Sequence, residues 1–558
     1  MTPEQLSSAI VRALAALTDD GTLTLPGGVP ERVVVERPKV REHGDYATNV
    51  ALQLAKKAGV APRELASLLA ARLEGVQGIA SVEVAGPGFL NIRVAAEAQG
   101  AVAAQVVAAG PSYGTSDTLA GTSVNVEFIS ANPTGPLHLG HTRWAVVGDA
   151  IARVLQAAGA AVTREFYIND RGSQMDKFGA SLEASALGKP VPEDGYHGDY
   201  VHDLAKRIVA EDPEVLDLPE AERTGAFREA GYALQLADQR QALERFRTHF
   251  DVWFSERSLY DQHGVEHGIE KLREQGHLYE ADGALWMRTT DFGDDKDRVL
   301  VRSNGEFTYF ASDTAYYVDK RERGFDVCLY LLGADHHGYV GRLKAMAACA
   351  GDDPERNIEV LIGQLVKIMR DAEELRLSKR AGTMVTLEEL LDLIGVDALR
   401  YTLARYPADS PLTVDVELIT KQTNENPVFY VQYAHARLAS ILRNARELGV
   451  SPASTGGDGD FDPSLLSHEK EGELLRALAE FPRVVAAAAR LREPHRVARY
   501  LEDTASAFHK FYDSCRVLPQ GDEEPSDLHR ARLLLVEATR VVLANGLELL
   551  GVSAPERM

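Results

Sequence analysis

The chain has 558 residues, of which 45% are hydrophobic and 26% are charged, and its net charge is −23. This length predicts two to four domains, and the acidic balance argues against a protein that coats nucleic acid. No apolar run reaches the roughly 18 residues of a membrane span, and Arg12 interrupts the apolar N-terminal stretch, so we expect neither a membrane anchor nor a signal peptide. Three cysteines far apart in sequence favour a reducing cytoplasm.

Residues 1–115 have the pattern of a small α+β domain. Helical periodicity opens the segment, and two strands are predicted on either side of the turn Gly86-Pro87-Gly88. An alanine-rich helix over 95–109 is expected to lead out of this domain.

The region 116–390 is predicted to be an α/β domain built on a parallel sheet. A strand before residue 130, a helix from His141 onward and a strand over 162–168 form a βαβ unit. Further buried strands are predicted over 326–335 and 358–368. A charged, helix-rich stretch of about 175–290 is expected to be an insertion.

Nearly the whole chain after about residue 385 is predicted to be helical. We expect a connecting helical segment over 391–425 and a helical bundle over 426–558. One loop of the bundle has acidic residues at the spacing of an EF-hand calcium loop, but Pro463 stands where glycine is needed. A polar interhelical loop is the better interpretation of these residues, which are Asp458, Asp460, Asp462 and Glu469.

Three residues at the predicted strand-to-helix junction suggest phosphate chemistry. Free backbone N–H groups and the positive end of the helix dipole attract anions there, and Gly140 would let a ligand approach the backbone closely. His138 and His141 could stabilise charge that develops on a phosphate. A zinc site or two purely structural histidines are alternatives, but zinc needs three or four ligands and no cysteine is near.

A second polar segment lies about 240 residues later, in "RLSKR" (376–380). Lys379 is a mobile point charge suited to pyrophosphate, and Ser378 can donate a hydrogen bond. Such a loop alone is usually only solvated, but together with the histidine junction it becomes a specific signal.

These motifs resemble those of class I aminoacyl-tRNA synthetases. "HLGH" is similar to their HIGH motif, and "RLSKR" is similar to their KMSKS loop with Arg376 and Leu377 in place of lysine and methionine. More closely, and over essentially the whole chain, the sequence resembles the bacterial type of arginyl-tRNA synthetase. The segments that carry this resemblance are "GDYATNVALQLAKKAG", "GPGFLNIRV", "ISANPTGPLHLGHTRWAVVGDA", "YINDRGSQM", "GADHHGYVGRLKA", "GVDALRYTLARY", "NPVFYVQYAHAR" and "GVSAPERM".

The resemblance implies a Rossmann-like (HUP-type) catalytic domain between an α+β N-terminal domain that contacts tRNA and an all-α anticodon-binding bundle. It implies that arginine is activated with ATP and passed to the 3′ end of tRNA(Arg), in the cytoplasm and by a monomer. Mg²⁺ would accompany ATP, and no zinc is expected. By similarity His138, His141 and Lys379 are catalytic, and the ATP-binding residues are His138, Gly140, His141, Ser378 and Lys379.

The resemblance also implies an arginine site. A guanidinium favours planar, bidentate carboxylate partners, and Glu127 and Asp313 would supply them. The implied arginine-binding residues are Glu127, Ser130, Asn132, Tyr309, Asp313 and His336. Without the motif, Tyr309 and Asp313 would be an ordinary helix start, and Asp335 with its two following histidines could be a metal site. Whether Asp335 or His336 contacts the substrate stays open.

The implied tRNA-binding residues fall in two places. In the N-terminal domain Phe89 could stack on an unpaired base and Asn91 could read its edge, although both also suit an ordinary hairpin. In the helical bundle the resemblance implies Tyr433, Arg437 and Met558. In this family arginine activation generally requires bound tRNA, and we expect the same here.

Three other functions compete with this one. A class I synthetase for another amino acid is disfavoured by Glu127 and Asp313, which do not suit an apolar substrate. A nucleotidylyltransferase acting on a small molecule would not need the helical C-terminal half. A non-catalytic tRNA-binding paralogue would have no reason to keep both histidines and Lys379.

Overall fold

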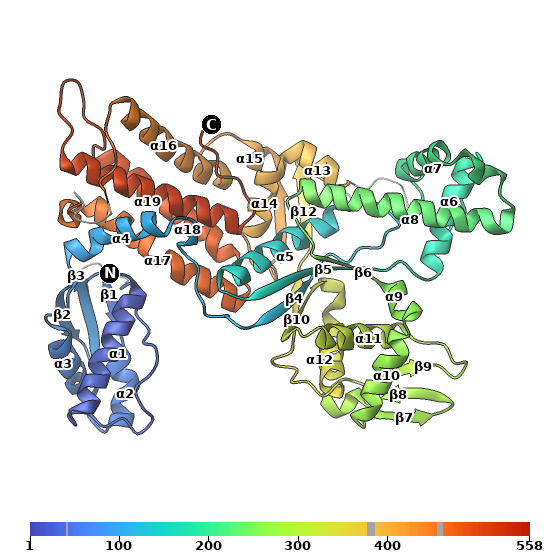
Figure 1. The fold of residues 1–558 in the computed structure, drawn as a ribbon, viewed down its shortest axis with the longest axis horizontal. Helices are drawn as coiled ribbons and strands as arrows, with labels where there is room; N and C mark the ends of the chain where they lie inside the picture. Colours follow the sequence, from blue (N-terminus) through green and yellow to red (C-terminus); the bar gives the residue numbers. More distant parts are fainter. Residues whose placement is uncertain (39, 41–42, 376–384, 455–460) are drawn as a thin grey trace.

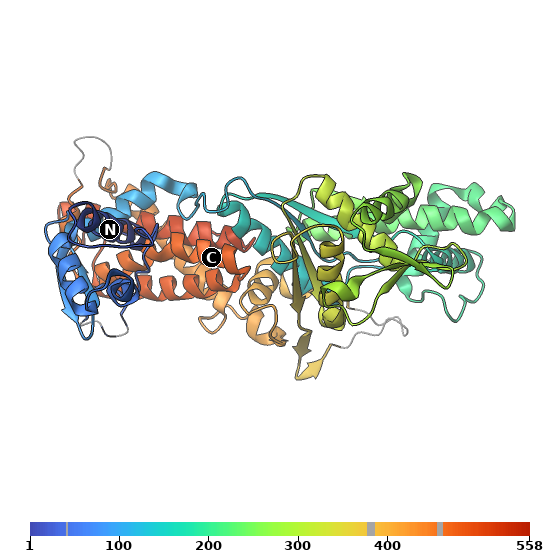
Figure 2. The same cartoon turned by 90° about the horizontal axis from the view of Figure 1, so that it is seen from below.

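The computed structural model describes residues 1–38, 40, 43–375, 385–454 and 461–558. The molecule is elongated (Figures 1 and 2): the N-terminal and C-terminal helical parts share one end, a parallel sheet lies near the middle, and a helical arm forms the other end. The expected order of an α+β, an α/β and an all-helical part is confirmed.

The N-terminal domain packs three helices, α1 (Pro3–Asp19), α2 (Val50–Ala58) and α3 (Pro62–Leu73), against a small sheet. The sheet has the order β1-β3-β2 and is antiparallel, with β1 (Tyr46–Thr48), β2 (Ile79–Ala85) and β3 (Phe89–Val94). The predicted hairpin is therefore correct. The predicted alanine-rich helix, α4 (Ala96–Ala109), leaves the domain and packs on the C-terminal helices.

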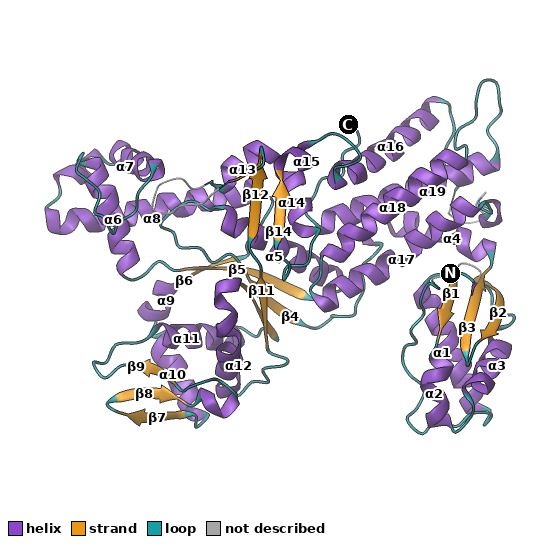
Figure 3. Ribbon diagram, turned by 180° about the vertical axis from the view of Figure 1, so that it is seen from behind, coloured by secondary structure: helices purple, strands orange, loops and turns teal. Residues whose placement is uncertain are grey.

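The central sheet is parallel and has the order β11-β10-β4-β5-β6. The predicted βαβ unit is present as β4 (Ser123–Glu127), α5 (Leu139–Ala157) and β5 (Ala161–Ile168), because Val147, Ile151 and Leu155 bury one face of the helix against the sheet. The other strands are β6 (Val252–Ser255), β10 (Val327–Gly333) and β11 (Ile358–Gly363). Figure 3 shows these strands crossing the middle of the molecule.

Three expectations about strands are wrong. The predicted strand over 358–368 is two strands, because the chain turns at Leu365, which is 74% exposed. The second of them, β12 (Val366–Arg370), joins a separate sheet with β13 (Glu373–Glu374) and β14 (Leu412–Asp415). The expected helical insertion over 175–290 contains β6, whose four residues are too few to stand out from the charged sequence around them. The connecting segment 391–425, expected to be helical, contains β14.

The segment between β5 and β10 builds two units on opposite sides of β6. Before β6, the helices α6 (Ser173–Ala186), α7 (Asp199–Glu211) and α8 (Glu220–Arg245) form the arm. After β6, α9 (Glu256–Asp261) and α10 (Gly264–Glu274) lead into a small antiparallel sheet of β7 (Leu278–Ala281), β8 (Ala284–Met287) and β9 (Arg298–Val301). Then α11 (Tyr309–Glu322) returns to the central sheet, and α12 (Val340–Cys349) lies between β10 and β11 in sequence.

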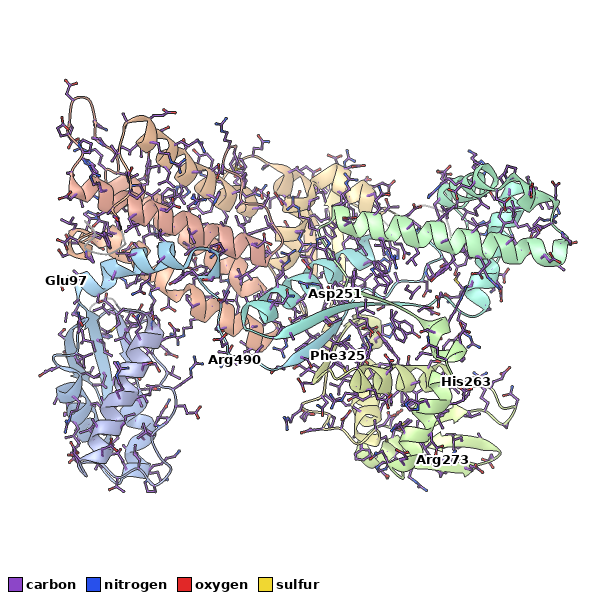
Figure 4. The ribbon with its side chains drawn as sticks, viewed as in Figure 1. Glu97, Asp251, His263, Arg273, Phe325 and Arg490 are labelled. Atoms are coloured by element: carbon purple, nitrogen blue, oxygen red, sulfur yellow. The ribbon has the colours of Figure 1, made fainter. Side chains whose placement is uncertain are left out.

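Figure 4 helps to orient the sheet. Asp251 directly precedes β6 and Phe325 lies two residues before β10, so they mark the edge at which the parallel strands begin. Ligands of open α/β sheets bind at the opposite edge, outside the carboxyl ends of the strands. His263 and Arg273 mark α10 of the smaller unit, away from the arm.

The C-terminal half is dominated by helices that share one core of leucine, valine, alanine and phenylalanine side chains. They are α13 (Leu387–Ile394), α14 (Val396–Ala404), α15 (Val416–Thr420), α16 (Pro427–Glu447), α17 (Glu469–Leu491), α18 (His495–Ser514) and α19 (Asp527–Leu549). In the acidic loop, Asp462 caps a 3-10 turn by accepting hydrogen bonds from Ser464, while Asp458 and Asp460 lie outside the described residues. In the part of the chain that the structure describes, no helix is both long and apolar enough to cross a membrane.

A fully buried guanidinium joins the catalytic and helical parts. Arg400 of α14 pairs with Asp149 of α5, and donates to the backbone oxygens of Phe246, just after α8, and Leu550, just after α19. Burial alone would raise the pKa of Asp149, but the guanidiniums of Arg400, Arg153 and Arg164 hold it below its usual value. Four segments far apart in sequence are therefore fixed around one cation.

We expect the substitution Arg400→Leu to lower the free energy of unfolding by about 3 to 5 kcal/mol, because it leaves a buried carboxylate and several carbonyl oxygens without their donor. Calorimetric unfolding of the full chain measures this change. Lys421→Ala is the control, since its pair with Glu425, at 3.1 Å, is exposed and contributes less than about 1 kcal/mol. Equal effects of the two substitutions would contradict the prediction.

Candidate active site

The histidine junction lies between β4 and α5, at the carboxyl edge of the central sheet. His138 is the N-cap of α5: its Nδ1 accepts the Gly140 N–H at 3.1 Å, and the His138 N–H donates to Nδ1 of His141 at 3.1 Å. The two rings lie 4.0 Å apart. Because both Nδ1 atoms accept from the backbone, a neutral ring carries its proton on Nε2. A Cβ at position 140 would approach Cε1 of His138 to 2.9 Å, so glycine is needed here.

The segment that leads from β4 to this junction has a strained backbone. Ile129 and Ser130 have φ values of +70° and +45°, which L-residues rarely adopt and β-branched residues avoid. In this conformation the Ser130 hydroxyl donates to Oε1 of Glu127 at 3.0 Å, and its oxygen accepts the backbone N–H of Tyr167 at 3.2 Å. The strained backbone therefore places the Ser130 hydroxyl against the carboxylate of Glu127, the last residue of β4.

The arm holds the next part of the segment. Gln239 of α8 donates to the carbonyl oxygens of Asn132 and Gly135 at 3.0 and 2.8 Å, and Tyr200 of α7 donates to that of Thr134 at 3.0 Å. The Asn132 amide donates to Oε1 of Gln174, on α6, at 2.6 Å. Sequence reasoning missed these contacts, because their partners are tens of residues away in sequence.

The expected phosphate loop falls outside the described residues, since 376–384 are not described and Ser378 and Lys379 are among them. The residues that follow the loop are attached to the histidine junction. Thr386 forms a β-bridge with His138, and the Leu387 N–H donates to the Leu137 carbonyl at 2.8 Å. The end of the loop is thus fixed beside α5.

The second half of the expected arginine site lies on α11 and the turn after β10. Tyr309 is the first residue of α11 and is 75% exposed, while Asp313 lies one turn further and is partly buried. The Tyr339 hydroxyl donates to Asp313 at 2.8 Å, and the exposed His336 packs edge-on against the Tyr339 ring at 6.2 Å. The side chain of Asp335 is outside the described part.

Several carboxylates share this region. Burial raises the pKa of Asp313 to about 6; the Tyr339 hydrogen bond opposes this shift and the charge of Glu127 adds to it. Burial also raises the pKa of Glu256 to about 7, with Arg171 opposing the shift and Asp170 and Asp313 adding to it. The carboxylates therefore disfavour one another's charge, and a cation bound beside them would favour their ionised forms.

Two residues near these carboxylates were missed by sequence reasoning. Glu256, the first residue of α9, is buried near Asp313. Lys320 is fully buried on α11, with its Nζ 2.6 Å from Oε2 of Glu127. Lys320 follows Asp313 by two helical turns, so helical periodicity could have placed it on the same face.

The expected tRNA residues lie far from this pocket. Phe89 at the start of β3 is 41% exposed, whereas Asn91 is buried in the same strand. On α16 the ring of Tyr433 stacks with Phe429 at 5.9 Å, and the Arg437 guanidinium lies 4.3 Å from the centre of the Tyr512 ring. The last residues of the chain run along the same helix, where His435 and Arg443 bond to the Pro555 and Glu556 carbonyls at 2.8 and 3.0 Å, and Met558 is exposed.

Comparison with known proteins gives matches over nearly the whole chain. A model of the arginyl-tRNA synthetase N-terminal domain matches residues 4–94, one of the class I (R) tRNA synthetase catalytic domain matches 105–207 and 220–404, and one of the DALR anticodon-binding domain matches 431–558. Two curated relatives named arginine–tRNA ligase, from Kineococcus radiotolerans and Frankia alni, are 57% identical over 559 residues and 58% identical over 558, with 100% of both chains covered in each case. The solved Thermus thermophilus arginyl-tRNA synthetase is 23% identical and has the same fold, with a TM-score of 0.75 over 100% of both chains.

The buried charge of Asp313 predicts a substitution that stabilises the ligand-free protein. The folded pKa of about 6 lies above the unfolded value near 3.9, so the folded state loses stability as pH rises through this interval and stays penalised above it. Asp313→Asn removes the penalty, and we expect about 1 to 3 kcal/mol of stabilisation at pH 8. Thermal unfolding at pH 8 and pH 4.5 checks this, because the gain at the lower pH should fall to about a third of its value at pH 8. The same gain at both pH values would count against the assignment.

Proposed function

The chain belongs to the arginyl-tRNA synthetase family, and on this premise we propose how its residues divide the work of an arginine–tRNA ligase. The enzyme activates arginine with ATP to arginyl-adenylate and transfers the arginyl group to tRNA. The observation that carries the proposal is that the histidine junction of α5 and the carboxylates Glu127 and Asp313 converge at the ligand-binding edge of one parallel sheet.

ATP binds at the N-terminus of α5. The free N–H groups of the first turn and the positive end of the helix dipole attract the phosphates, and Gly140 lets the nucleotide approach the backbone. His138 and His141 direct Nε2 at charge that builds up on the α-phosphate and the leaving pyrophosphate. Ser378 and Lys379 then close over the pyrophosphate. Support for this step is the attachment of Thr386, at the end of their loop, to His138.

Arginine binds with its guanidinium between Glu127 and Asp313. Asn132 holds the backbone end of the amino acid, and Ser130 lies close by, with its hydroxyl on Glu127. Tyr309 covers the side chain, and His336 lines the far wall. The arm supports this geometry, because it fixes the backbone at Asn132 and in the three residues that follow it. A lysine substrate would leave acceptors of the pocket without donors, since an ammonium lacks the guanidinium fork.

The arginine carboxylate, held near the α5 N-terminus, attacks the α-phosphate, and the bond to pyrophosphate breaks. In the second step the ribose hydroxyl at the 3′ end of tRNA attacks the activated carbonyl, and AMP leaves. The protein contributes mainly positioning and charge stabilisation. Imidazole and backbone N–H donors suit phosphate oxygens rather than a hard cation, so Mg²⁺ would arrive on the ATP phosphates rather than in a protein cage.

The tRNA lies along the side that joins the N-terminal and helical domains. Phe89 stacks on an unpaired base, with Asn91 shaping the strand beneath it from inside the fold. Tyr433, Arg437 and Met558 form part of the anticodon surface, supported by the run of the C-terminal residues along α16. Binding of tRNA completes the arginine and ATP site, as induced fit.

Steady-state kinetics test this division of roles. Glu127→Gln should raise KM for arginine by up to about tenfold and Asp313→Asn by more, while KM for ATP stays within about twofold for both. His141→Asn keeps an acceptor for the His138 N–H but removes the imidazole, so kcat should fall about 100-fold with KM for arginine unchanged. If Glu127→Gln and Asp313→Asn altered only the ATP parameters, the proposed arginine site would be wrong.

The need for tRNA is tested separately by pyrophosphate exchange. With arginine, ATP and Mg²⁺ but no tRNA we expect exchange to be near background, and tRNA(Arg) should restore it. Charging of bulk bacterial tRNA with each of the twenty amino acids supplies the positive control. Full exchange without tRNA would show that the site is complete in the free enzyme.

A further inference from the structure

Lys320 is a fully buried cation for which the reaction described above gives no role. Its Nζ lies 2.6 Å from Oε2 of Glu127, and 4.3 and 3.9 Å from the ring centres of Tyr316 and Tyr330. An ammonium loses several kcal/mol of hydration free energy on burial, and an ion pair with two aromatic faces is what offsets that loss. Lys320 is therefore held in one position against the proposed arginine pocket.

The face of the central sheet that α11 covers carries two carboxylates side by side. Glu127 of β4 and Glu165 of β5 are paired in register, and neighbouring strands lie about 4.8 Å apart. The α11 segment supplies one cation to each of them: Lys320 pairs with Glu127 at 2.6 Å and Arg323 pairs with Glu165 at 2.7 Å. These two ion pairs form a natural comparison.

The two carboxylates differ in how many of their acceptor positions are filled. Glu165 accepts two hydrogen bonds from Arg323 at 2.7 and 2.8 Å, one from Tyr316 at 2.5 Å and one from Asn125 at 2.9 Å, which is about the full capacity of a carboxylate. Among the described residues, Glu127 accepts only from Ser130 at 3.0 Å and from Lys320. Glu165 is thus structural, and Glu127 keeps capacity for donors of a ligand.

The charges in the pocket follow from this difference. Lys320, which pairs with Glu127, lies two turns after Asp313 on α11, and the charge of Glu127 adds to the raised pKa of Asp313. A guanidinium brings one positive charge, and two uncompensated carboxylates would leave one buried negative charge in excess. Of Glu127, Lys320 and Asp313, the pairing leaves one net negative charge, on Asp313.

We propose that Lys320 is a positioning residue that sets the charge of the arginine pocket: it neutralises Glu127, which then acts on arginine as a hydrogen-bond acceptor, and leaves Asp313 as the charge partner of the guanidinium. This rests on the proposed arginine site. Other titratable groups also face this region. Around Asp313 they are Tyr167, Glu256, Tyr330, His336, Tyr339 and Arg342, and around Lys320 they are Glu165, Tyr316, Cys328 and Tyr330.

The decisive measurement is kcat/KM for arginine against pH in the complete charging reaction. On the acidic side of this profile kcat/KM falls as carboxylates become protonated, and we call this part the acid limb. Lys320→Met leaves two neighbouring carboxylates that compete for one proton, so the midpoint of the acid limb should rise by about one pH unit or more. At pH 7 KM for arginine should rise about tenfold and recover toward the wild-type value at pH 9, with KM for ATP within about twofold. Lys320→Arg keeps the charge and should keep the limb.

Two further variants separate charge from packing. Arg323→Met removes the matched cation beside Glu165 and should lower stability without moving the limb. The double variant Lys320→Met with Glu127→Gln removes both charges and should return the limb to its wild-type position. An unmoved limb in Lys320→Met, an equal movement in Arg323→Met, or no return in the double variant would each overturn the proposal.

A third comparison does not depend on Lys320→Met folding. If Asp313 is the charge partner, Asp313→Asn should cost about 100-fold in kcat/KM for arginine and Glu127→Gln about tenfold or less, and the reverse order would overturn the proposal. If neither substitution changes KM for arginine, the arginine site itself is wrongly assigned. If both do and Lys320→Met leaves the limb in place, only the role of Lys320 fails.

Discussion

The position of the two histidines depends on a cation buried about two to three turns further along α5, where Arg400 pairs with Asp149. Arg400 pairs with Asp149 of α5 and also donates to the backbone just after α8 and just after α19. The helix that begins at the two histidines is therefore bound both to the arm and to the end of the helical domain. Nearby, Asp397 on the same helix as Arg400 accepts hydrogen bonds from Gln432 of α16 and from the Ser553 N–H of the C-terminal segment. Asp397 and Arg400 therefore join α16 and the C-terminal segment to α14, and α14 to α5. Rigid contacts of this kind are the physical means by which an anticodon surface could bias a distant active site.

Buried ion pairs hold carboxylates in place on both faces of the central sheet. On one face Arg400 neutralises Asp149, and on the other Lys320 and Arg323 neutralise Glu127 and Glu165. Buried ion pairs add little net stability compared with apolar residues of the same shape, because desolvation offsets the attraction. Their value here is geometric, because each holds a carboxylate or a helix in one position. These ion pairs lie where the proposed reaction requires fixed orientations of the side chains.

Much of the fold could be predicted from the sequence, because the βαβ unit, the N-terminal hairpin and the C-terminal helices have strong local periodicity. Short or isolated strands could not, since the four residues of β6 and of β14 gain their pairing from partners far along the chain. In the site, His138 and His141 were found from their local spacing and the family motif. Lys320, Glu256 and Gln239 were not, because their roles arise only when α11, α9 and α8 are packed against β4 and the segment after it. A buried lysine on a helix looks the same in sequence as an exposed one.

The described site is rigid in one half and open in the other. The strained turn at Ile129 and Ser130, the caps of α5 and the contacts of Gln239 and Tyr200 fix the β4–α5 side before any substrate arrives. On the α11 side Tyr309 is mostly in solvent and Asp313 is a carboxylate whose ionisation is disfavoured by burial. Binding of a guanidinium would relieve that penalty, while closure over it must come from elsewhere. The proposal that tRNA binding completes the site agrees with this arrangement, because the β4–α5 side is already held by contacts within the protein and the α11 side is not.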